Sequence, residues 1–399
     1  MPRRSGLIEK SRRFQNASYF VHIRVLIREF SGPVPAWRLV WQFRGNFCTL
    51  SLVNLLTPIG KLYGIGMDIR NRLYDRAVLR SHSLGARTIS IGNLTAGGTG
   101  KTPLVELTAR TLAESGEKVC ILTRGYGRTT PRRRVIVSDG DRVLADASTG
   151  GDEPVELARK LLGQAIVIAD ADRVGAAAWA REHFGITAFV LDDAFQHRRA
   201  KRDLDIVCID ATDPWGNGHV LPAGTLREPL KNIRRADLVV LTRADLVGSV
   251  DPVVKQLREC GMDAPVVFAS AKMRGLAKFD NGIASDLNEP QLRAENVLAF
   301  AGIGNPSSFR KLLEKENLNI KGFEIFRDHH RYTQADITSL EQKARSLSAN
   351  CLLTTAKDAV KLDGSKFKLP VFVVEIEVEI SDPALFRSLV TGRVPDRRA

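Results

Sequence analysis

Residues Ile89–Pro103 read ISIGNLTAGGTGKTP. The β-branched start of this stretch predicts a strand, its middle predicts a glycine-rich turn, and its end predicts a helix that begins near Lys101. Glycine lets backbone N–H groups approach an anion closely, and the helix adds the positive end of its dipole. Gly97, Gly98 and Gly100 supply this here. The stretch is therefore typical of a P-loop that binds a nucleoside triphosphate.

Individual roles follow from this interpretation. Lys101 would reach the β- and γ-phosphates, and the hydroxyl of Thr102 would bind Mg²⁺. Thr95 stands where the pattern G-x-x-x-x-G-K-[ST] has its first Gly, and the strand–loop–helix context compensates for that departure. The predicted nucleotide-binding residues of this turn are Asn93, Thr95, Ala96, Gly97, Gly98, Thr99, Gly100, Lys101 and Thr102.

Short β-branched runs alternate with helical patterns after this turn. Further strands are predicted at Lys118–Thr123, Ala165–Ile168, Thr187–Asp192, Leu204–Ile209, Asp237–Leu241 and Pro265–Ala269. Helices are predicted at Pro103–Ser115, Asp172–Glu182 and Pro252–Cys260. This alternation predicts an α/β fold with a doubly wound, mostly parallel sheet. A polar stretch, Gly275–Glu295, then separates this body from a second α/β unit that starts at the predicted strand Val297–Ala301.

The positive charge of the chain lies mainly at its start. The chain carries 59 Lys and Arg against 45 Asp and Glu, and most of the excess of +14 falls within residues 1–80. From Phe47 to about Leu79, apolar residues recur at helical spacing with arginines on the other face. Such a basic amphipathic stretch favours a membrane interface. The alternative is a helix packed on the core with its Arg heads in water.

Several classes of protein are disfavoured. No segment reaches 18 uninterrupted apolar residues, which argues against a membrane span. His22 and Arg24 interrupt the only candidate secretory segment, although the Arg-rich start leaves an organelle transit peptide as a minor alternative. The five cysteines form no C-x-x-C pair, which argues against a disulfide framework or a zinc cluster.

The segment Ala188–Arg198 reads AFVLDDAFQHR and places two carboxylates at the end of an apolar strand. Asp192 and Asp193 would lie at the carboxyl edge of the sheet, where ligands of open α/β folds bind. One carboxylate would bind Mg²⁺ and the other would support it. The pair could otherwise be a polar strand end without function.

Two further motifs offer a proton acceptor. In Gly151–Pro154, GDEP, Asp152 is either the cap of a helix or a base that takes the proton of an attacking hydroxyl. In Asp328–Tyr332, DHHRY, a histidine paired with a carboxylate would tune such a base, whereas a solvated loop histidine is the alternative.

Two loops carry arginines that suit an anion. In Thr123–Arg128, TRGYGR, the side chains of Arg124 and Arg128 could clamp a phosphate. In Leu221–Pro229, LPAGTLREP, a turn presents Arg227 and Glu228. Each arginine could also be an ordinary surface charge.

The ordered set of motifs resembles one family. GNLTAGGTGKTP, LTRGYGR, GDEP, DDAFQHR, DLDIVCID, LPAGTLREP, a DHH loop and TTAKDAVKL occur in this order, as in tetraacyldisaccharide 4′-kinases of lipid A biosynthesis. The resemblance covers about residues 47–390. It implies two Rossmann-like α/β/α domains, the larger with the P-loop, and an ATP-dependent transfer to the 4′-hydroxyl of an acylated glucosamine disaccharide 1-phosphate that forms lipid IVA.

The resemblance also implies roles for single residues. The catalytic residues would be Asp152 as base, His329 as its partner, and Lys101. Asp192, Asp193 and Thr102 would hold Mg²⁺, and Gln196 would join the ATP site. Arg124, Glu153, Arg227 and Glu228 would contact phosphates or sugar.

Boundaries and location follow in the same way. We expect a basic extension at 1–45, an amphipathic membrane-associating region at 46–85, the P-loop domain at 86–290 and a smaller α/β domain at 291–399. The expected location is the cytoplasmic face of the bacterial inner membrane, bound peripherally. The extension is not a feature associated with the family. Nucleic acid is not an expected partner, and no protein partner can be inferred.

One alternative is a P-loop GTPase or metallochaperone-like switch. Leu241–Asp245, LTRAD, loosely resembles a guanine-reading N/T-K-x-D motif, with Arg in place of Lys. A preference for GTP without lipid turnover would favour it. A weaker alternative, nucleic-acid binding by the basic arm, finds no recognition motif in the chain.

Overall fold

The computed structural model describes residues 22–26, 38–43, 46–280, 283–286, 295–363 and 366–392. The chain forms two compact units. The first comprises Met1–Leu73 and Trp215–Asn232, and the second comprises Tyr74–Pro214 and Ile233–Ala399. The remaining parts of the predicted N-terminal extension and of the predicted polar stretch lie outside the described residues.

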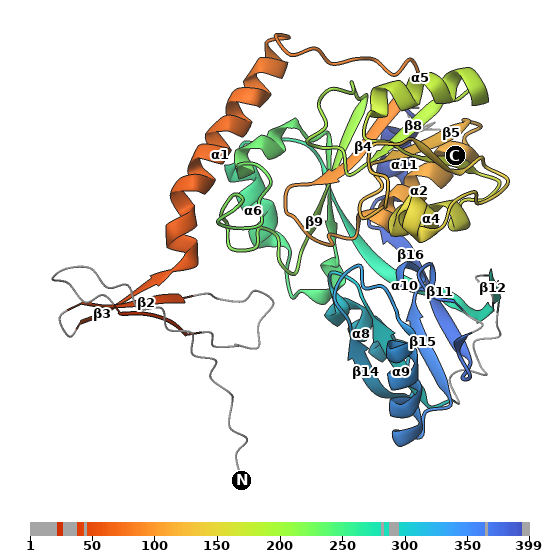
Figure 1. Cartoon of the computed structure of the whole chain (residues 1–399). Coiled ribbons are helices and arrows are strands. Elements are labelled where there is room, and N and C mark those ends of the chain that lie inside the picture. The colour runs from red at the N-terminus through yellow and green to blue at the C-terminus, as the bar shows by residue number, and fades with distance from the viewer. Residues whose placement is uncertain are drawn as a thin grey trace. The chain divides into compact units, whose positions relative to one another are not determined.

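The first unit contains a small antiparallel sheet followed by a long helix (Figure 1). Its strands are β1 (His22–Leu26), β2 (Arg38–Phe43) and β3 (Asn46–Ser51), and the helix is α1 (Leu52–Asp75). The prediction of helix from Phe47 is wrong for its first residues, because Phe47–Ser51 pair with β2. Phe, Cys and Thr in this run favour extended backbone, which explains the later helix start.

Helix α1 packs through small residues and exposes apolar ones. A Cβ on Gly60 would lie 2.8 Å from the carbonyl oxygen of Val220, and one on Gly64 would touch Pro229. The other side of the helix carries Leu62, Ile65 and Ile69, which are 69%, 55% and 50% exposed. None of the helices in the described ranges has the length and hydropathy of a bilayer-spanning segment.

The second unit is built on one large, mostly parallel sheet. Its order is β14-β13-β15-β16-β11-β10-β9-β4-β8-β5-β7-β6, with β12 paired to β11. The strands of the P-loop half are β4 (Arg87–Asn93), β5 (Val119–Thr123), β6 (Val135–Ser138), β7 (Ala165–Ala169), β8 (Ala188–Asp192), β9 (Leu204–Asp210) and β10 (Leu238–Thr242). The predicted strands of this half agree with the structure to within one or two residues. Consecutive apolar residues allow these strands to be buried on both faces, as parallel strands usually are.

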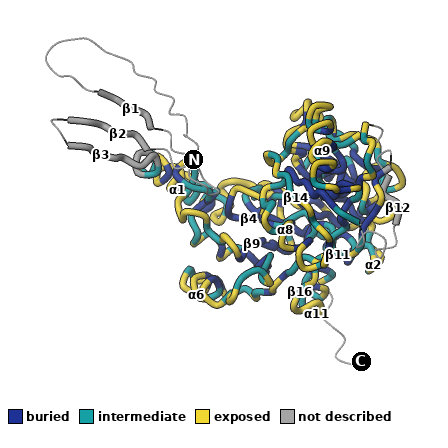
Figure 2. The backbone as a smooth tube through the Cα atoms, turned by 90° about the horizontal axis from the view of Figure 1, so that it is seen from below, coloured by how far each residue is buried: buried dark blue, intermediate teal, exposed yellow. Residues whose placement is uncertain are grey.

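Helices cover both faces of the P-loop half. Helices α2 (Lys101–Glu114), α4 (Asp152–Lys160) and α11 (Pro383–Thr391) contribute to one apolar cluster with β4, β5 and β7. Helix α5 (Arg173–Phe184) packs through alanines on the opposite face. The strands are accordingly the most deeply buried elements, shown dark blue in Figure 2. The shorter elements are α3 (Ala147–Gly150), η1 (Leu230–Arg235), η2 (Ala244–Leu246) and α6 (Asp251–Glu259).

A long strand connects the two halves of the sheet. β11 (Val266–Asp280) continues past the predicted end Ala269 and pairs antiparallel with β16 (Val371–Ile380), with a register shift between Met273 and Gly275. The first residues of the predicted polar separator are therefore strand. They were missed because Lys278 and Asp280 interrupt the apolar run, although Leu276, Ala277 and Phe279 are buried. β12 (Ile283–Asp286) pairs with the end of β11.

The second half of the sheet forms the small lobe, defined here as residues 295–363. It contains the parallel strands β13 (Val297–Ala301), β14 (Ile320–Ile325) and β15 (Cys351–Thr355). Helix α8 (Pro306–Lys315) packs on one face, and α9 (Gln334–Ser346) and the short α10 (Ala356–Ala359) pack on the other. The α/β class is confirmed, and the boundary at residue 290 stays a prediction.

Candidate active site

The glycine-rich turn joins β4 to α2 as the sequence predicts. Gly97 and Gly100 have φ values of 135° and 75°, which residues with a side chain rarely adopt. No atom lies within 4 Å of the position that a Cβ on Gly97 would occupy. The Asn93 amide donates to the Thr95 carbonyl at 2.6 Å, and the Gln196 amide donates to the Asn93 carbonyl at 3.0 Å. These contacts shape the turn, while Ala96, Gly97 and Gly98 stay exposed. An open cradle of this form suits phosphate oxygens.

The paired aspartates lie beside the P-loop lysine. The Lys101 ammonium is 3.5 Å from Asp193 Oδ1. Asp192 is buried at the end of β8 and accepts a hydrogen bond from the Thr123 hydroxyl at 3.0 Å. Burial and the negative charges of Glu153 and Asp193 raise the pKa of Asp192 to about 6. A divalent cation would stabilise a buried carboxylate that has acidic neighbours, so this pair suits a cation site.

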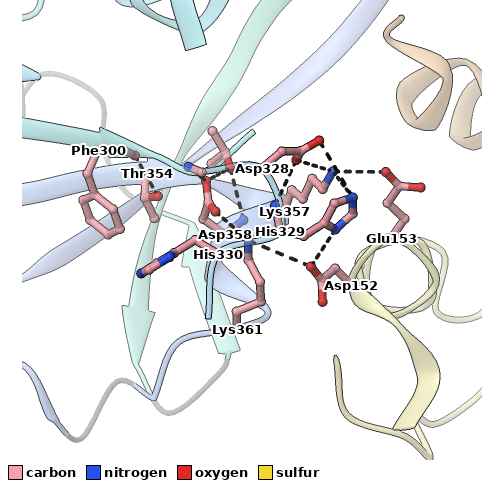
Figure 3. A network of polar contacts seen from close by, with 12 residues as sticks. Asp152, Glu153, Phe300, Asp328, His329, His330, Thr354, Lys357, Asp358 and Lys361 are labelled. Atoms are coloured by element: carbon pink, nitrogen blue, oxygen red, sulfur yellow. Dashed lines mark hydrogen bonds and ion pairs between the residues drawn. The ribbon is translucent and has the colours of Figure 1, made fainter. Parts of the chain in front are cut away.

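The GDEP motif opens helix α4 and faces the small lobe. Asp152 is the first residue of α4, and its Oδ2 lies 3.1 Å from Nδ1 of His329 (Figure 3). His329 has a φ of 58°, in the left-handed region, which costs backbone energy and is common at functional sites. The two predicted partners, 177 residues apart in sequence, are therefore in hydrogen-bond contact.

The second histidine of the DHH loop contacts a different carboxylate. His330 Nε2 lies 3.1 Å from Asp336, the N3 residue of the capping box that starts α9. Its ring stacks on Phe326 with a centroid distance of 4.8 Å. Of the two adjacent histidines, only His329 contacts Asp152.

Sequence reasoning missed two lysines of this network. Lys357 and Lys361 belong to TTAKDAVKL, a motif that contributed to the resemblance but received no role. The Lys357 ammonium lies 3.1 Å from Glu153 Oε1, 3.2 Å from Asp328 Oδ1 and 3.5 Å from His329 Nε2. The Lys361 ammonium is 2.8 Å from Asp358 and 3.9 Å from Asp152. The sequence did contain a sign of them: the two lysines are spaced i, i+4 after a predicted strand and a Thr that can cap a helix, which places them on one face.

The remaining predicted residues fall into different surroundings. Arg124 is exposed directly after β5. Arg128, which the sequence also offered as a phosphate clamp, is buried and donates to the carbonyls of Ala169 and Pro131, so its role is structural. Glu228 is buried in the first unit, where it accepts from the Asn71 amide at 2.9 Å, and Arg227 precedes it.

The residues of LTRAD, the possible guanine-binding motif, contact other parts of the protein. The Thr242 hydroxyl donates to the Thr99 carbonyl at 2.8 Å, and Arg243 bonds Asp210 and the Gly98 carbonyl. Asp245, the residue that would bind the base, forms an ion pair with Lys315 at 2.7 Å. Thr242 and Arg243 therefore support the P-loop, whereas Asp245 pairs with Lys315.

The donor set fits a magnesium ion that is shared with a nucleotide. No group of three or more His, Cys, Asp or Glu side chains within the described ranges could hold a metal alone. Mg²⁺ is usually bound by one or two carboxylates plus phosphate oxygens and water. Asp192, Asp193 and the Thr102 hydroxyl at the start of α2 supply such a partial set.

Comparison with known proteins agrees with this geometry. Residues 52–394 match the family model described as tetraacyldisaccharide-1-P 4′-kinase. A tetraacyldisaccharide 4′-kinase of Syntrophus aciditrophicus is 39% identical over 369 residues, covering 90% of this chain and 98% of that protein. One of Chlorobaculum parvum is 41% identical over 294 residues, covering 73% and 79%.

A solved structure is similar as well. The crystal structure of LpxK from Aquifex aeolicus, in complex with ATP, superposes with a TM-score of 0.69 at 32% identity. The match covers 86% of this chain and 99% of that chain.

Proposed function

Because the chain belongs to the tetraacyldisaccharide-1-P 4′-kinase family, we propose that it phosphorylates the 4′-hydroxyl of tetraacyldisaccharide 1-phosphate with ATP. The product would be lipid IVA of lipid A biosynthesis. One observation carries the proposal. Asp152 is hydrogen-bonded to His329, while the adjacent Glu153 is close enough to raise the pKa of Asp192 beside the P-loop. The Asp152–His329 pair supports the assignment of a proton acceptor, and the effect of Glu153 on Asp192 supports its proximity to the phosphate cradle.

The residues divide the work between binding and proton transfer. Backbone N–H groups of Gly97–Gly100 and the Lys101 ammonium bind the phosphates, with Asn93 and Gln196 holding the turn. Asp152 accepts the proton of the sugar hydroxyl, and His329 orients and supports this carboxylate. Most of the rate enhancement comes from positioning and from charge stabilisation, as in other phosphoryl transfers.

Asp192, Asp193 and Thr102 are the proposed magnesium ligands. When bound, the ion would neutralise charge on the phosphates and help to fix their orientation. Asp192 is held for this task by the Thr123 hydroxyl and by Arg173, which donates to its backbone carbonyl at 2.8 Å.

Four residues are proposed to contact the substrate. Arg124 is exposed after β5, and Glu153 lies on the first turn of α4 beside Asp152. Arg227 and Glu228 carry the same assignment from the family motif LPAGTLREP. Glu228 already accepts a hydrogen bond from Asn71, so it would act by fixing its loop as much as by direct contact.

The proposed location is the cytoplasmic face of the bacterial inner membrane, bound peripherally. The exposed aliphatic side of α1, with Leu62, Ile65 and Ile69, and the excess of Lys and Arg in residues 1–80 support it. Apolar side chains next to basic residues are typical of helices in the membrane interface.

The proposal is tested by measuring ATP consumption with and without a tetraacyl disaccharide 1-phosphate. Turnover should require the lipid, and Lys101→Ala should reduce it at least ~100-fold, because the lysine neutralises phosphate charge. A clear preference for GTP over ATP, with no lipid phosphorylated, would support a nucleotide switch instead.

A further inference from the structure

Helix α10 and the residues directly after it present two lysines, Lys357 and Lys361, to the Asp152–His329 pair. The Thr355 hydroxyl accepts from the Asp358 backbone N–H at 3.1 Å and donates to the Asp358 carboxylate at 2.8 Å. The fully buried Asp358 also accepts from the Gly302 N–H at 2.9 Å. The turn is thus fixed against β13 and β15, which makes it a rigid support for the side chains of Lys357 and Lys361.

Lys357 has three donors and faces three acceptors from different segments. Glu153 lies on α4, whereas Asp328 and His329 lie on the loop after β14. Burial alone would lower the pKa of Lys357, but the carboxylates of Glu153 and Asp328 raise it overall. The group is therefore an ammonium, which can donate hydrogen bonds but cannot accept them.

This charge determines where His329 carries its proton. Its Nε2 faces the Lys357 ammonium at 3.5 Å and must act as an acceptor there. Asp328 Oδ2 is 3.8 Å from the same nitrogen, beyond hydrogen-bond distance. For a neutral ring this arrangement assigns the proton to Nδ1, which lies 3.1 Å from Asp152 Oδ2.

Lys361 acts on the same carboxylate oxygen from the other side. Its side chain is 3% exposed, and its ammonium lies between Asp358 and Asp152. The charged and titratable groups facing Asp152 are thus His329 and Lys361, with Lys357 and Glu153 adjacent. Two ammonium groups offset the carboxylates of Asp152, Glu153 and Asp328, which would otherwise repel one another.

We propose that Lys357 and Lys361 are positioning residues of the kinase. Lys357 selects the His329 tautomer that donates to Asp152, and Lys361 holds the same oxygen, Oδ2, from the other side, so that Oδ1 is left for the acceptor hydroxyl. This inference rests on the proposed function and adds two residues to its machinery. Both lysines act through Asp152 and His329.

A double-mutant cycle tests the inference with the full chain. Lys357→Met should lower kcat for lipid phosphorylation about 10- to 100-fold, the range of a disturbed catalytic group, with the KM for ATP changed less than about threefold. In a His329→Ala background, the same substitution should cost less than about threefold, because its target is gone. Equal losses in both backgrounds would overturn the inference.

Three further variants test Lys361 and the specificity of the effect. Lys361→Arg should retain more kcat than Lys361→Met, since it keeps a cation beside Asp152; equal activities would count against Lys361. Lys315→Met is the matched control, because Lys315 also bridges the small lobe to the P-loop half, through Asp245. It should keep full activity, and a loss as large as that of Lys357→Met would mean that any ion pair between the halves suffices.

Nitrogen-15 NMR of histidine-labelled protein gives a readout without turnover. With His329 assigned by His329→Gln, the wild type should show the Nδ1–H tautomer, and Lys357→Met should shift the ring towards Nε2–H. An Nε2–H ring in the wild type would overturn the inference. If the wild type shows Nδ1–H but phosphorylates no lipid, the proposed function fails and the positioning inference for Asp152 remains.

Discussion

The ionised carboxylate of Asp192 destabilises the folded protein. Its carboxylate is buried, and Glu153 and Asp193 add repulsion, so its pKa is raised to about 6 from 3.8. Between those values the folded state binds a proton more readily than the unfolded state does. Stability therefore falls as pH rises through this window. Ligand cations and Lys101 are the groups that would relieve the repulsion.

Asp192→Asn should accordingly stabilise the metal-free protein while abolishing activity. At pH 7.5 the free energy of unfolding should rise by about 2 to 3 kcal/mol, since each pKa unit is worth about 1.4 kcal/mol. At pH 4 the gain should nearly vanish, because the native carboxyl is then protonated. Denaturant unfolding in a chelating buffer measures both values. Destabilisation of equal size at both pH values would contradict this explanation.

The sequence predicted the local structure of the motifs that carry the candidate site residues, whose roles stay predictions. Gly97–Thr102 and the Asp192–Asp193 pair could be placed because a strand end and a glycine turn constrain position locally. Lys357 and Lys361 could not, because their meaning depends on a contact with α4, some 200 residues earlier. Arg128 was misjudged for the same reason, since burial against the end of β7 cannot be read from its neighbours in sequence.

At the scale of elements, a buried charge network fixes α4 to α2. The Lys160 ammonium, on the last residue of α4, lies 3.3 Å from Glu106 of α2 and 3.0 Å from Glu156, with all three side chains at most 12% exposed. Because α2 begins at Lys101 and α4 begins at Asp152, this network holds the phosphate cradle and the base-bearing helix together.

Lys160→Met should destabilise the fold by about 3 kcal/mol, since it leaves the carboxylate of Glu156 buried without its cation, while Glu106 keeps its ion pair with Arg110. Urea unfolding measures the change. The control is Arg310→Met, which removes an exposed i, i+4 pair with Glu314 and should cost less than about 0.5 kcal/mol. Similar losses for both variants would show that burial of the network contributes nothing.

The accuracy of the predicted strand boundaries depends on how far local sequence determines each strand. Strands β4, β8 and β9 were predicted closely because continuous apolar runs are confined to buried parallel strands. β11 was cut short because polar residues such as Lys272 and Lys278 interrupt its second half, and its partner, β16, lies about 100 residues later in the sequence. Residues 47–51 fit a helical spacing as well as an extended one, and pairing with β2 decided for the strand.

At the scale of the whole molecule, α1 exposes an aliphatic stripe that water does not favour. Replacing Ile65 and Ile69 by Glu should reduce binding to anionic phospholipid vesicles at least ~10-fold, because each buried aliphatic side chain contributes about 1.5 to 3 kcal/mol. Vesicle sedimentation measures this, and turnover of a detergent-dispersed acceptor should be unchanged.

Leu144→Glu is the matched control for the stripe, since Leu144 is 52% exposed in the second unit. It should leave vesicle binding unaltered. Equal binding by the wild type and by the double Glu variant would mean that α1 is not the membrane contact.

In the proposed reaction, Asp152 takes a proton from a sugar hydroxyl beside bound ATP. Single-turnover phosphorylation of tetraacyldisaccharide 1-phosphate by Asp152→Asn, with ATP affinity measured on the same preparation, tests this most directly. Asn keeps the shape and an acceptor for His329 but is not a base. We predict an ATP Kd within about threefold of the wild type and transfer at least ~100-fold slower. Transfer within about threefold of the wild type would contradict the account.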